Sequence, residues 1–195
     1  MVLAHDINLV LNGGTLGNKP ALVYLTGASG VGKTTILSCL REHSQDPNTI
    51  FLHFDSIGVP SSAEMVRKEG SLENWQEITT HRWIEKIVTE YQDSDIVVIE
   101  GQSSLDFVED ACNRFGITDY MILLIDCDED TMHQRLVHNR KQPELVSEDM
   151  RNWLVFLRAQ ATRKKVCIVD TSSQSLESTV CFIQEQVLDK IRMTR

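Results

Sequence analysis

The chain has 195 residues, of which 42% are hydrophobic and 24% are charged, and these proportions exclude a disordered chain in favour of a folded globular domain. Its 28 acidic and 19 basic residues give a formal charge of −9, which argues against nucleic acid as the main partner. The length suits a single domain, and no apolar segment reaches the length of a membrane span, so we expect no membrane partner.

The cysteines indicate a reducing environment. There are 5 of them, an odd number, without a Cys-x-x-Cys pair and mostly within apolar runs. We therefore expect reduced, mostly buried thiols, and neither a structural disulfide nor a zinc site. The first residues, 1–6, lack the basic start of a secretory signal, so the cytoplasm is the expected location. The sequence leaves the oligomeric state open.

Along the chain, residues 1–20 are expected to form an N-terminal extension, because Gly13, Gly14 and Gly17 precede Pro20. A single domain is expected to follow over residues 21–195. It begins with the apolar run 21–26, which has the length and composition of a buried strand.

Residues 27–34 read Gly-Ala-Ser-Gly-Val-Gly-Lys-Thr, a complete G-x-x-x-x-G-K-[ST] phosphate-binding loop between that strand and a helix over 34–41. The glycines let the backbone curl around an anion, Lys33 reaches the outer phosphates, and the Thr34 hydroxyl can ligate Mg²⁺. The motif predicts a bound nucleoside triphosphate. The predicted nucleotide-binding residues of this segment are Gly27, Ala28, Ser29, Gly30, Val31, Gly32, Lys33, Thr34 and Thr35.

Further apolar runs of strand length recur after the loop, with helical patterns between them. The runs are 49–54, 95–99, 120–125 and 166–169, and the helical patterns are 71–91, 105–115, 129–140, 147–164 and 176–193. Continuous apolarity suits strands covered on both faces, as in a parallel sheet. The alternation predicts an α/β fold, a three-layer α/β/α sandwich around a five-stranded parallel sheet with the ligand at the carboxyl ends of its strands.

The remaining motifs select among phosphate-loop families. We find no Asn-Lys-x-Asp for guanine and no transporter-type Ser-Gly-Gly-Gln. The positive signals are the phosphate loop, His-Phe-Asp-Ser-Ile-Gly-Val-Pro at 53–60, Val-Ile-Glu-Gly at 98–101 and Arg-Leu-Val-His-Asn-Arg at 135–140. In this order they resemble the small P-loop kinases: nucleoside monophosphate, gluconate and shikimate kinases and chloramphenicol phosphotransferase. The resemblance spans residues 21–191 and implies the P-loop NTPase strand order 2-3-1-4-5.

The resemblance also implies roles for acids at strand ends. Asp55 matches the acid that orients or deprotonates the acceptor hydroxyl, although it also fits an Asx-turn before Gly58. Glu100 matches the acid that helps to hold Mg²⁺, where Asp is more usual in the family. Asp126 ends another apolar run and competes for that role, and Asp170 does so more weakly.

Arg135 and Arg140 match the family pair in which the first arginine stacks on the adenine and the second stabilises the transferring phosphoryl group. Lys141 and Arg151 are substitutes, and both members of the pair also fit solvated cations at a helix end. The resemblance implies a short lid near 140–147. Asp170 begins a segment, 170–174, that resembles the adenine-contacting loop but also fits an ordinary strand-to-helix turn.

The acceptor site is expected around Asp55, residues 58–70 and the start of the helix at 71–91. Arg67, Lys68, His81 and Arg82 could meet an anionic acceptor, and Trp75 and Trp83 a planar one, although tryptophans at helical spacing are more often core residues. The few arginines here favour a hydroxyl-bearing acceptor over a monophosphate. The histidines show no metal-ligand spacing, so Mg²⁺ with ATP is the only metal expected.

The leading hypothesis is an ATP- and Mg²⁺-dependent kinase for a small-molecule acceptor, in which Lys33, Asp55 and Arg140 are catalytic and Thr34 and Glu100 hold the metal. The alternative is a nucleotide-binding regulatory ATPase that acts through a protein partner. An antibiotic-modifying kinase shares the first chemistry with another acceptor. The sequence leaves the acceptor and the choice between ATP and GTP open.

Overall fold

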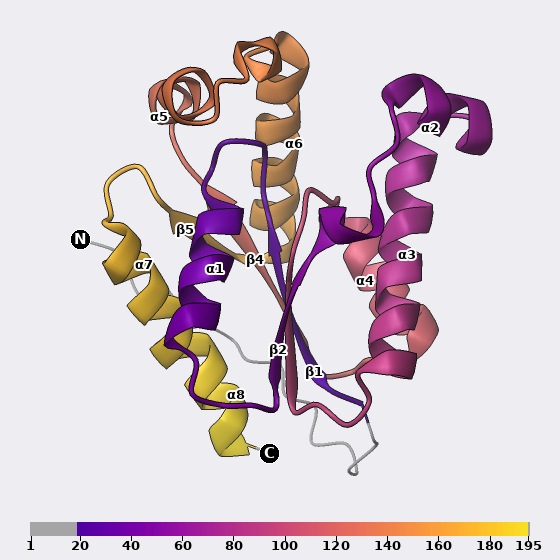
Figure 1. Ribbon diagram of the computed structural model, residues 1–195, viewed down its shortest axis with the longest axis vertical. Coiled ribbons are helices and arrows are strands. Elements are labelled where there is room, and N and C mark those ends of the chain that lie inside the picture. The colour runs from indigo at the N-terminus through magenta and orange to yellow at the C-terminus, as the bar shows by residue number, and fades with distance from the viewer. Residues whose placement is uncertain (1–18, 195) are drawn as a thin grey trace.

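A computed structural model describes residues 19–194, so nearly all of the expected N-terminal extension lies outside the described residues (Figure 1). The sheet has five parallel strands in the order β2-β3-β1-β4-β5, which confirms the expected fold class and strand order. The strands are β1 (Ala21–Thr26), β2 (Thr49–His53), β3 (Ile96–Glu100), β4 (Tyr120–Asp126) and β5 (Cys167–Asp170).

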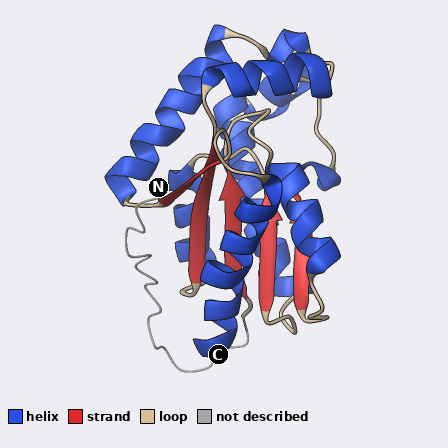
Figure 2. Cartoon of the chain, turned by 90° about the vertical axis from the view of Figure 1, so that its left-hand side faces the viewer, coloured by secondary structure: helices blue, strands red, loops and turns tan. Residues whose placement is uncertain are grey.

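Helices cover both faces of this sheet (Figure 2). One face packs against α1 (Lys33–His43), α7 (Leu176–Ile183) and α8 (Asp189–Thr194), and the other packs against α3 (Leu72–Glu90), α4 (Leu105–Phe115) and α6 (Glu148–Lys164). The short helices α2 (Ser62–Glu69) and α5 (Glu129–Gln134) lie beyond the carboxyl ends of the strands (Figure 1).

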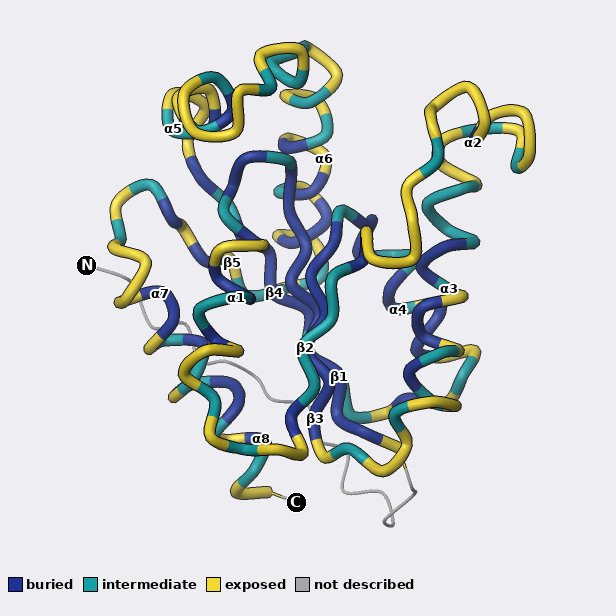
Figure 3. The backbone as a smooth tube through the Cα atoms, viewed as in Figure 1, coloured by how far each residue is buried: buried dark blue, intermediate teal, exposed yellow. Residues whose placement is uncertain are grey.

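The strands are apolar along their whole length because both of their faces are buried. In β1, Val23 and Leu25 point into the core under α1, and Leu22 and Tyr24 into the core under α3 and α4. All of them are fully buried, as the tube coloured by burial shows for the central strands (Figure 3). Burial of this apolar surface on both sides of one sheet is the main driving force for the fold.

The five cysteines are free thiols, of which Cys112 and Cys127 are buried and Cys181 is exposed. Within residues 19–194, no helix combines the length and the apolar content needed to cross a bilayer.

Four segments differ from the sequence prediction. The strand β2 ends at His53 because a 3₁₀ turn, η1 (Phe54–Ile57), follows it. The helix predicted over 129–140 divides into α5 and a π turn, η2 (Arg135–Asn139), and the helix over 176–193 contains another, η4 (Gln184–Leu188). Helix α2 was not predicted, because its eight residues bury only Met65 and so lack an apolar stripe. Its Ser61–Glu64 capping box was the available signal.

A buried polar network fixes the segment that follows β3. The Ser103 hydroxyl bonds the Tyr24 hydroxyl at 2.8 Å and the Thr80 hydroxyl at 2.9 Å, and the Ser103 carbonyl accepts from Thr26 Oγ1 at 2.6 Å. Gln160 of α6 accepts from the Leu105 backbone N–H at 2.9 Å. These bonds tie the end of β3 to β1, α3 and α6, so the carboxyl edge of the sheet is held from several sides.

Replacement of Ser103 by Ala should lower the free energy of unfolding by about 1–3 kcal/mol, because it leaves the buried Tyr24 hydroxyl without its partner. Urea unfolding measures this change. Ser56→Ala is the control, since Ser56 is exposed and its hydroxyl bonds only the His53 carbonyl, and it should change stability by less than about 0.5 kcal/mol. Equal stability of Ser103→Ala and the native chain would show that the network does not hold this edge.

Candidate active site

The phosphate-binding loop connects β1 to α1 at the carboxyl edge of the sheet. A Cβ at Gly27 would lie 2.3 Å from the Ile125 carbonyl oxygen, and one at Gly30 would lie 2.9 Å from Leu136 Cγ, so both positions require glycine. Helix α1 begins after Gly32 without a side-chain cap and without an acid in its first turn. Its first N–H groups and its dipole therefore remain available to an anion.

Lys33 is buried at the start of α1, and its ammonium is turned back over the loop. Its Nζ donates to the Gly27 carbonyl at 2.8 Å and to the Ala28 carbonyl at 2.9 Å. Burial lowers the pKa of Lys33 to about 8, and the negative charge of Glu100 opposes this shift. The lysine is thus held at the phosphate loop in a conformation from which it can reach bound phosphates.

Glu100 and Thr34 lie together at this edge. Because β3 pairs with β1 on one side and β2 on the other, the end of β3 lies beside the loop. The Thr34 hydroxyl donates to Glu100 Oε1 at 3.3 Å, and His53 Nδ1 lies 3.0 Å from the same oxygen. A hydroxyl and a carboxylate are the hard oxygen ligands that Mg²⁺ prefers, so these residues fit such an ion.

Asp126, the competing acid, has a different environment. Its Oδ2 accepts from Arg158 Nε of α6 at 2.8 Å, and the same guanidinium donates to the Cys127 carbonyl at 2.8 Å. This ion pair joins β4 to α6. Of the two acids that the sequence left open, only Glu100 contacts Thr34.

Asp55 lies on η1, directly after β2. Trp83 Nε1 donates to the Phe54 carbonyl at 2.9 Å and anchors this turn to α3. The turn to Gly58 uses the Asp55 backbone carbonyl, whereas within residues 19–194 the Asp55 carboxylate has no hydrogen-bond partner, so the Asx-turn does not form. Although the residue is exposed as a whole, partial desolvation and then the negative Glu100 raise the pKa of Asp55, and Lys33 and Arg140 oppose the shift.

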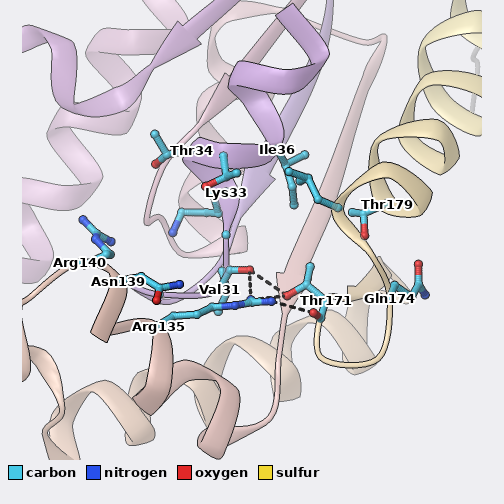
Figure 4. A pocket seen from close by; sticks show the side chains of 14 residues that line it. Val31, Lys33, Thr34, Ile36, Arg135, Asn139, Arg140, Thr171, Gln174 and Thr179 are labelled. Carbon is cyan, nitrogen blue, oxygen red and sulfur yellow. Dashed lines mark hydrogen bonds between the residues drawn. The ribbon is translucent and has the colours of Figure 1, made fainter. Parts of the chain in front are cut away.

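Arg135 is fixed between the phosphate loop and the segment after β5. Its guanidinium donates to the Val31 carbonyl at 3.1 Å, the Thr171 hydroxyl at 2.8 Å and the Thr171 carbonyl at 2.8 Å (Figure 4). The arginine therefore clamps two segments that are more than a hundred residues apart in the sequence, and it lies along one wall of the cavity described below.

The π turn η2 explains how Arg135 and Arg140 both reach the site. In an α-helix, residues five apart point in directions about 140° apart around the axis. Here the Arg140 N–H bonds the Arg135 carbonyl at 2.9 Å, the five-residue bond of a π turn, which brings the two residues onto one side of the helix. Asn139, which the sequence did not single out, lines the same cavity (Figure 4).

These elements enclose a cavity of about 440 Å³. It is lined by the loop, by the start of α1, by the π turn and by the segment from β5 to α7 (Figure 4). The lining residues that the sequence did not single out individually are Ile36, Asn139, Thr171, Gln174, Leu176 and Thr179. Thr171 and Gln174 belong to the segment that was expected to contact the adenine. Its first residue, Asp170, does not line the cavity, because its carboxylate accepts from the Ser172 N–H and the Ser173 hydroxyl.

The structure locates three of the residues expected at the acceptor site. Trp83 is buried in the core, so it does not offer a face to a ligand. Arg82 is exposed and lies 3.7 Å from Glu69 in a surface ion pair, so its role at the acceptor stays a prediction. His81 lies with Glu77 and Asp110 so that one ligand atom of each is within 4.8 Å of the others, a grouping that the sequence spacing did not suggest. The Arg114 guanidinium lies 3.4 Å from His81 Nδ1 and places a positive charge there, so we assign this group to the α3–α4 contact.

Two variants separate the competing acids. Glu100→Gln should reduce by at least about 10-fold the gain in ATP affinity that Mg²⁺ gives, because an amide oxygen is a weaker ligand than a carboxylate. Asp126→Asn should keep that gain while lowering stability, because it weakens the ion pair with Arg158. Calorimetric titration with ATP, in excess Mg²⁺ and in EDTA, measures both. The reverse outcome would assign the metal-binding role to Asp126 instead of Glu100.

Comparisons with protein families and with solved structures show the family and the fold of the chain. A family model described as AAA domain matches residues 23–152, which is more than half of the chain. No curated protein matches the sequence.

The solved structures that resemble it include the tunicamycin resistance protein of Deinococcus radiodurans, with 17% identity, a TM-score of 0.61, and coverage of 87% of this chain and 96% of that one. A gluconokinase from Sinorhizobium meliloti has 15% identity and a TM-score of 0.59, with coverage of 88% and 97%. The shikimate kinase of Acinetobacter baumannii in complex with shikimate has 17% identity and a TM-score of 0.53, with coverage of 89% and 96%. The resemblance inferred from the motifs is thereby confirmed: the chain belongs to the AAA domain family and has the fold of the small P-loop kinases.

Proposed function

We propose that this protein is an ATP- and Mg²⁺-dependent kinase that transfers the γ-phosphoryl group to a hydroxyl group of a small molecule. The observation that carries the proposal is the convergence of Lys33, Asp55, Glu100 and Arg140. Lys33 and Arg140 line one cavity, Glu100 bonds the adjacent Thr34, and Asp55 lies close enough for the charges of all three to influence it. These are a phosphate-binding cation, a base for a hydroxyl group, a metal-binding acid and a second cation.

On the donor side, the cavity of about 440 Å³ has the size of a nucleotide site. The open N-terminus of α1 and the loop amides would bind the phosphates, and Lys33 would exchange its loop carbonyls for phosphate oxygens. Arg135 and the 171–174 segment would bind the base, in line with the role expected from the sequence.

Thr34 and Glu100 would hold Mg²⁺. Bound there, the ion would supply positive charge that offsets the charge of the phosphates. Glu100 is longer by one methylene than the more usual Asp, and its hydrogen bonds to Thr34 and His53 keep it within reach of the Thr34 hydroxyl.

In the transfer step, the acceptor oxygen forms a bond to the γ-phosphorus as the bond between that phosphorus and the ADP oxygen breaks. The acceptor hydroxyl proton passes to the Asp55 carboxylate, which has no other hydrogen-bond partner within residues 19–194 and whose pKa is raised. Arg140 stabilises the charge that spreads over the phosphoryl oxygens. Positioning and charge neutralisation supply most of the acceleration.

A coupled assay of ADP formation, with a panel of neutral, anionic and cationic hydroxyl compounds, tests the proposal. Strong stimulation by one compound, with its phosphorylated product identified by mass spectrometry, is the expected result. Stimulation only by a protein from the source cell would contradict the kinase and support the alternative, a regulatory ATPase.

Two substitutions test the proposed catalytic groups. Lys33→Ala should abolish turnover, because the phosphates lose their buried cation. Asp55→Asn should lower turnover by at least about 100-fold and leave ATP affinity unchanged, because an amide does not accept the proton. Steady-state kinetics and calorimetry measure the two quantities, with the exposed Asp93→Asn as the control. Undiminished transfer by Asp55→Asn would remove the base assignment.

Binding of a transition-state analogue distinguishes the roles proposed for Arg135 and Arg140. Arg140→Ala should weaken binding of ADP with aluminium fluoride by at least about 100-fold and leave ADP binding nearly unchanged, because its charge acts on the transferring group. Arg135→Ala should weaken both ligands similarly, because Arg135 organises the cavity wall. Equal weakening of both ligands by Arg140→Ala would place Arg140 in ground-state binding.

A further inference from the structure

His53 links the two acids of the site, and the motifs assigned it no role. It is the last residue of β2 and lies in register with Glu100 of β3. Its Nδ1 is 3.0 Å from Glu100 Oε1, and the side chains are 28% and 9% exposed. The hydrogen bond is therefore largely shielded from water, and a fixed pairing of neighbouring strands sets its geometry.

Within residues 19–194, the Glu100 carboxylate accepts two hydrogen bonds, both on one oxygen. His53 Nδ1 and the Thr34 hydroxyl both approach Oε1, at 3.0 and 3.3 Å. Two donors from different elements, β2 and α1, fix the plane in which a long and otherwise flexible side chain lies. Of these two donors, only the Thr34 hydroxyl would remain without His53.

The backbone of His53 also connects this acid to the turn that carries Asp55. The Ser56 hydroxyl donates to the His53 carbonyl at 2.7 Å and closes the first part of η1. His53 thus contacts both groups of the site. Its backbone holds the turn that carries Asp55, the proposed base, and its ring holds Glu100, the proposed metal-binding acid. Because a carboxylate oxygen only accepts, His53 Nδ1 carries the hydrogen in this contact.

We propose that His53 is a positioning residue: its Nδ1–H holds the Glu100 carboxylate beside the Thr34 hydroxyl, in the orientation that receives Mg²⁺. The inference rests on the proposed function, since it concerns the metal acid of that site. Hydrogen bonds to metal-binding carboxylates fix their orientation, and loss of such a bond typically costs about 10–100-fold in metal affinity.

The test compares ATP affinity in excess Mg²⁺ with ATP affinity in EDTA, by calorimetry on the full chain. The ratio of the two affinities measures the contribution of the metal and needs no acceptor. His53→Ala should lower this ratio by about 10–100-fold and leave the affinity in EDTA unchanged. His53→Asn should keep the ratio within about 3-fold of the native value, because the Asn amide nitrogen replaces Nδ1 as the donor. His43→Ala is the control, because His43 is exposed at the end of α1.

An unchanged ratio in His53→Ala would overturn the inference, and so would a loss in His53→Asn as large as that in His53→Ala, because donation would then not be what matters. Should His53→Ala fail to fold, His53→Phe takes its place, since it keeps a ring, removes the donor and should lower the ratio equally. A native chain that binds ATP equally well with and without Mg²⁺ would instead overturn the proposed metal site itself. The His53 inference would then fall for a separate and recognisable reason.

Discussion

The buried carboxylate of Glu100 is the constraint on which the arrangement of the site depends. A carboxylate in a shielded position is costly unless hydrogen bonds or charges stabilise it. Here the Thr34 hydroxyl, the His53 ring and the nearby Lys33 supply that stabilisation. Because these groups come from α1 and β2, which flank β3 in space, the strand order 2-3-1 is what brings them together. The electrostatics of the site thus follow from the topology of the sheet.

The cavity wall formed by Arg135 and Arg140 depends on different contacts. Leu136 packs against Gly30, and Arg135 clamps the Val31 carbonyl, so α5 is fixed onto the phosphate loop at the start of the π turn. The extra residue that the π turn accommodates then directs Arg140 toward the cavity that Arg135 already lines. Only residues 140–147 separate this turn from α6, which begins at Glu148. This wall of the cavity is therefore organised largely before nucleotide binds.

Much of this could be predicted from the sequence, because the strongest constraints are local. The phosphate loop must have its glycines and its lysine in a fixed order, and doubly buried strands must be apolar throughout. The strand order followed from the family resemblance of the motifs. The choice between Glu100 and Asp126 was different, because both acids end an apolar strand, and only the three-dimensional contacts of Thr34 and Arg158 distinguish them.

The features that the sequence did not reveal depend on contacts between distant segments or on weak local signals. Helix α2 has too few buried residues to produce a periodic pattern. The π turn leaves no mark in hydrophobic periodicity, so the 129–140 segment was predicted as one helix. The contact of His53 with Glu100 requires the register of two strands that are 47 positions apart in the chain. The burial of Trp83 against Phe54 likewise depends on a contact between distant segments, which the helical spacing of the tryptophans does not reveal.

The central claim is that one nucleotide phosphate lies between Lys33, Arg140 and Asp55. A crystal structure of the protein with Mg²⁺ and a non-hydrolysable ATP analogue tests it most directly. The account predicts that the γ-phosphate contacts Lys33 and Arg140, that the metal lies beside Thr34 and Glu100, and that the Asp55 carboxylate faces the γ-phosphorus from the side opposite the leaving oxygen. A γ-phosphate directed away from Asp55, or a metal held by Asp126 instead of Glu100, would contradict it.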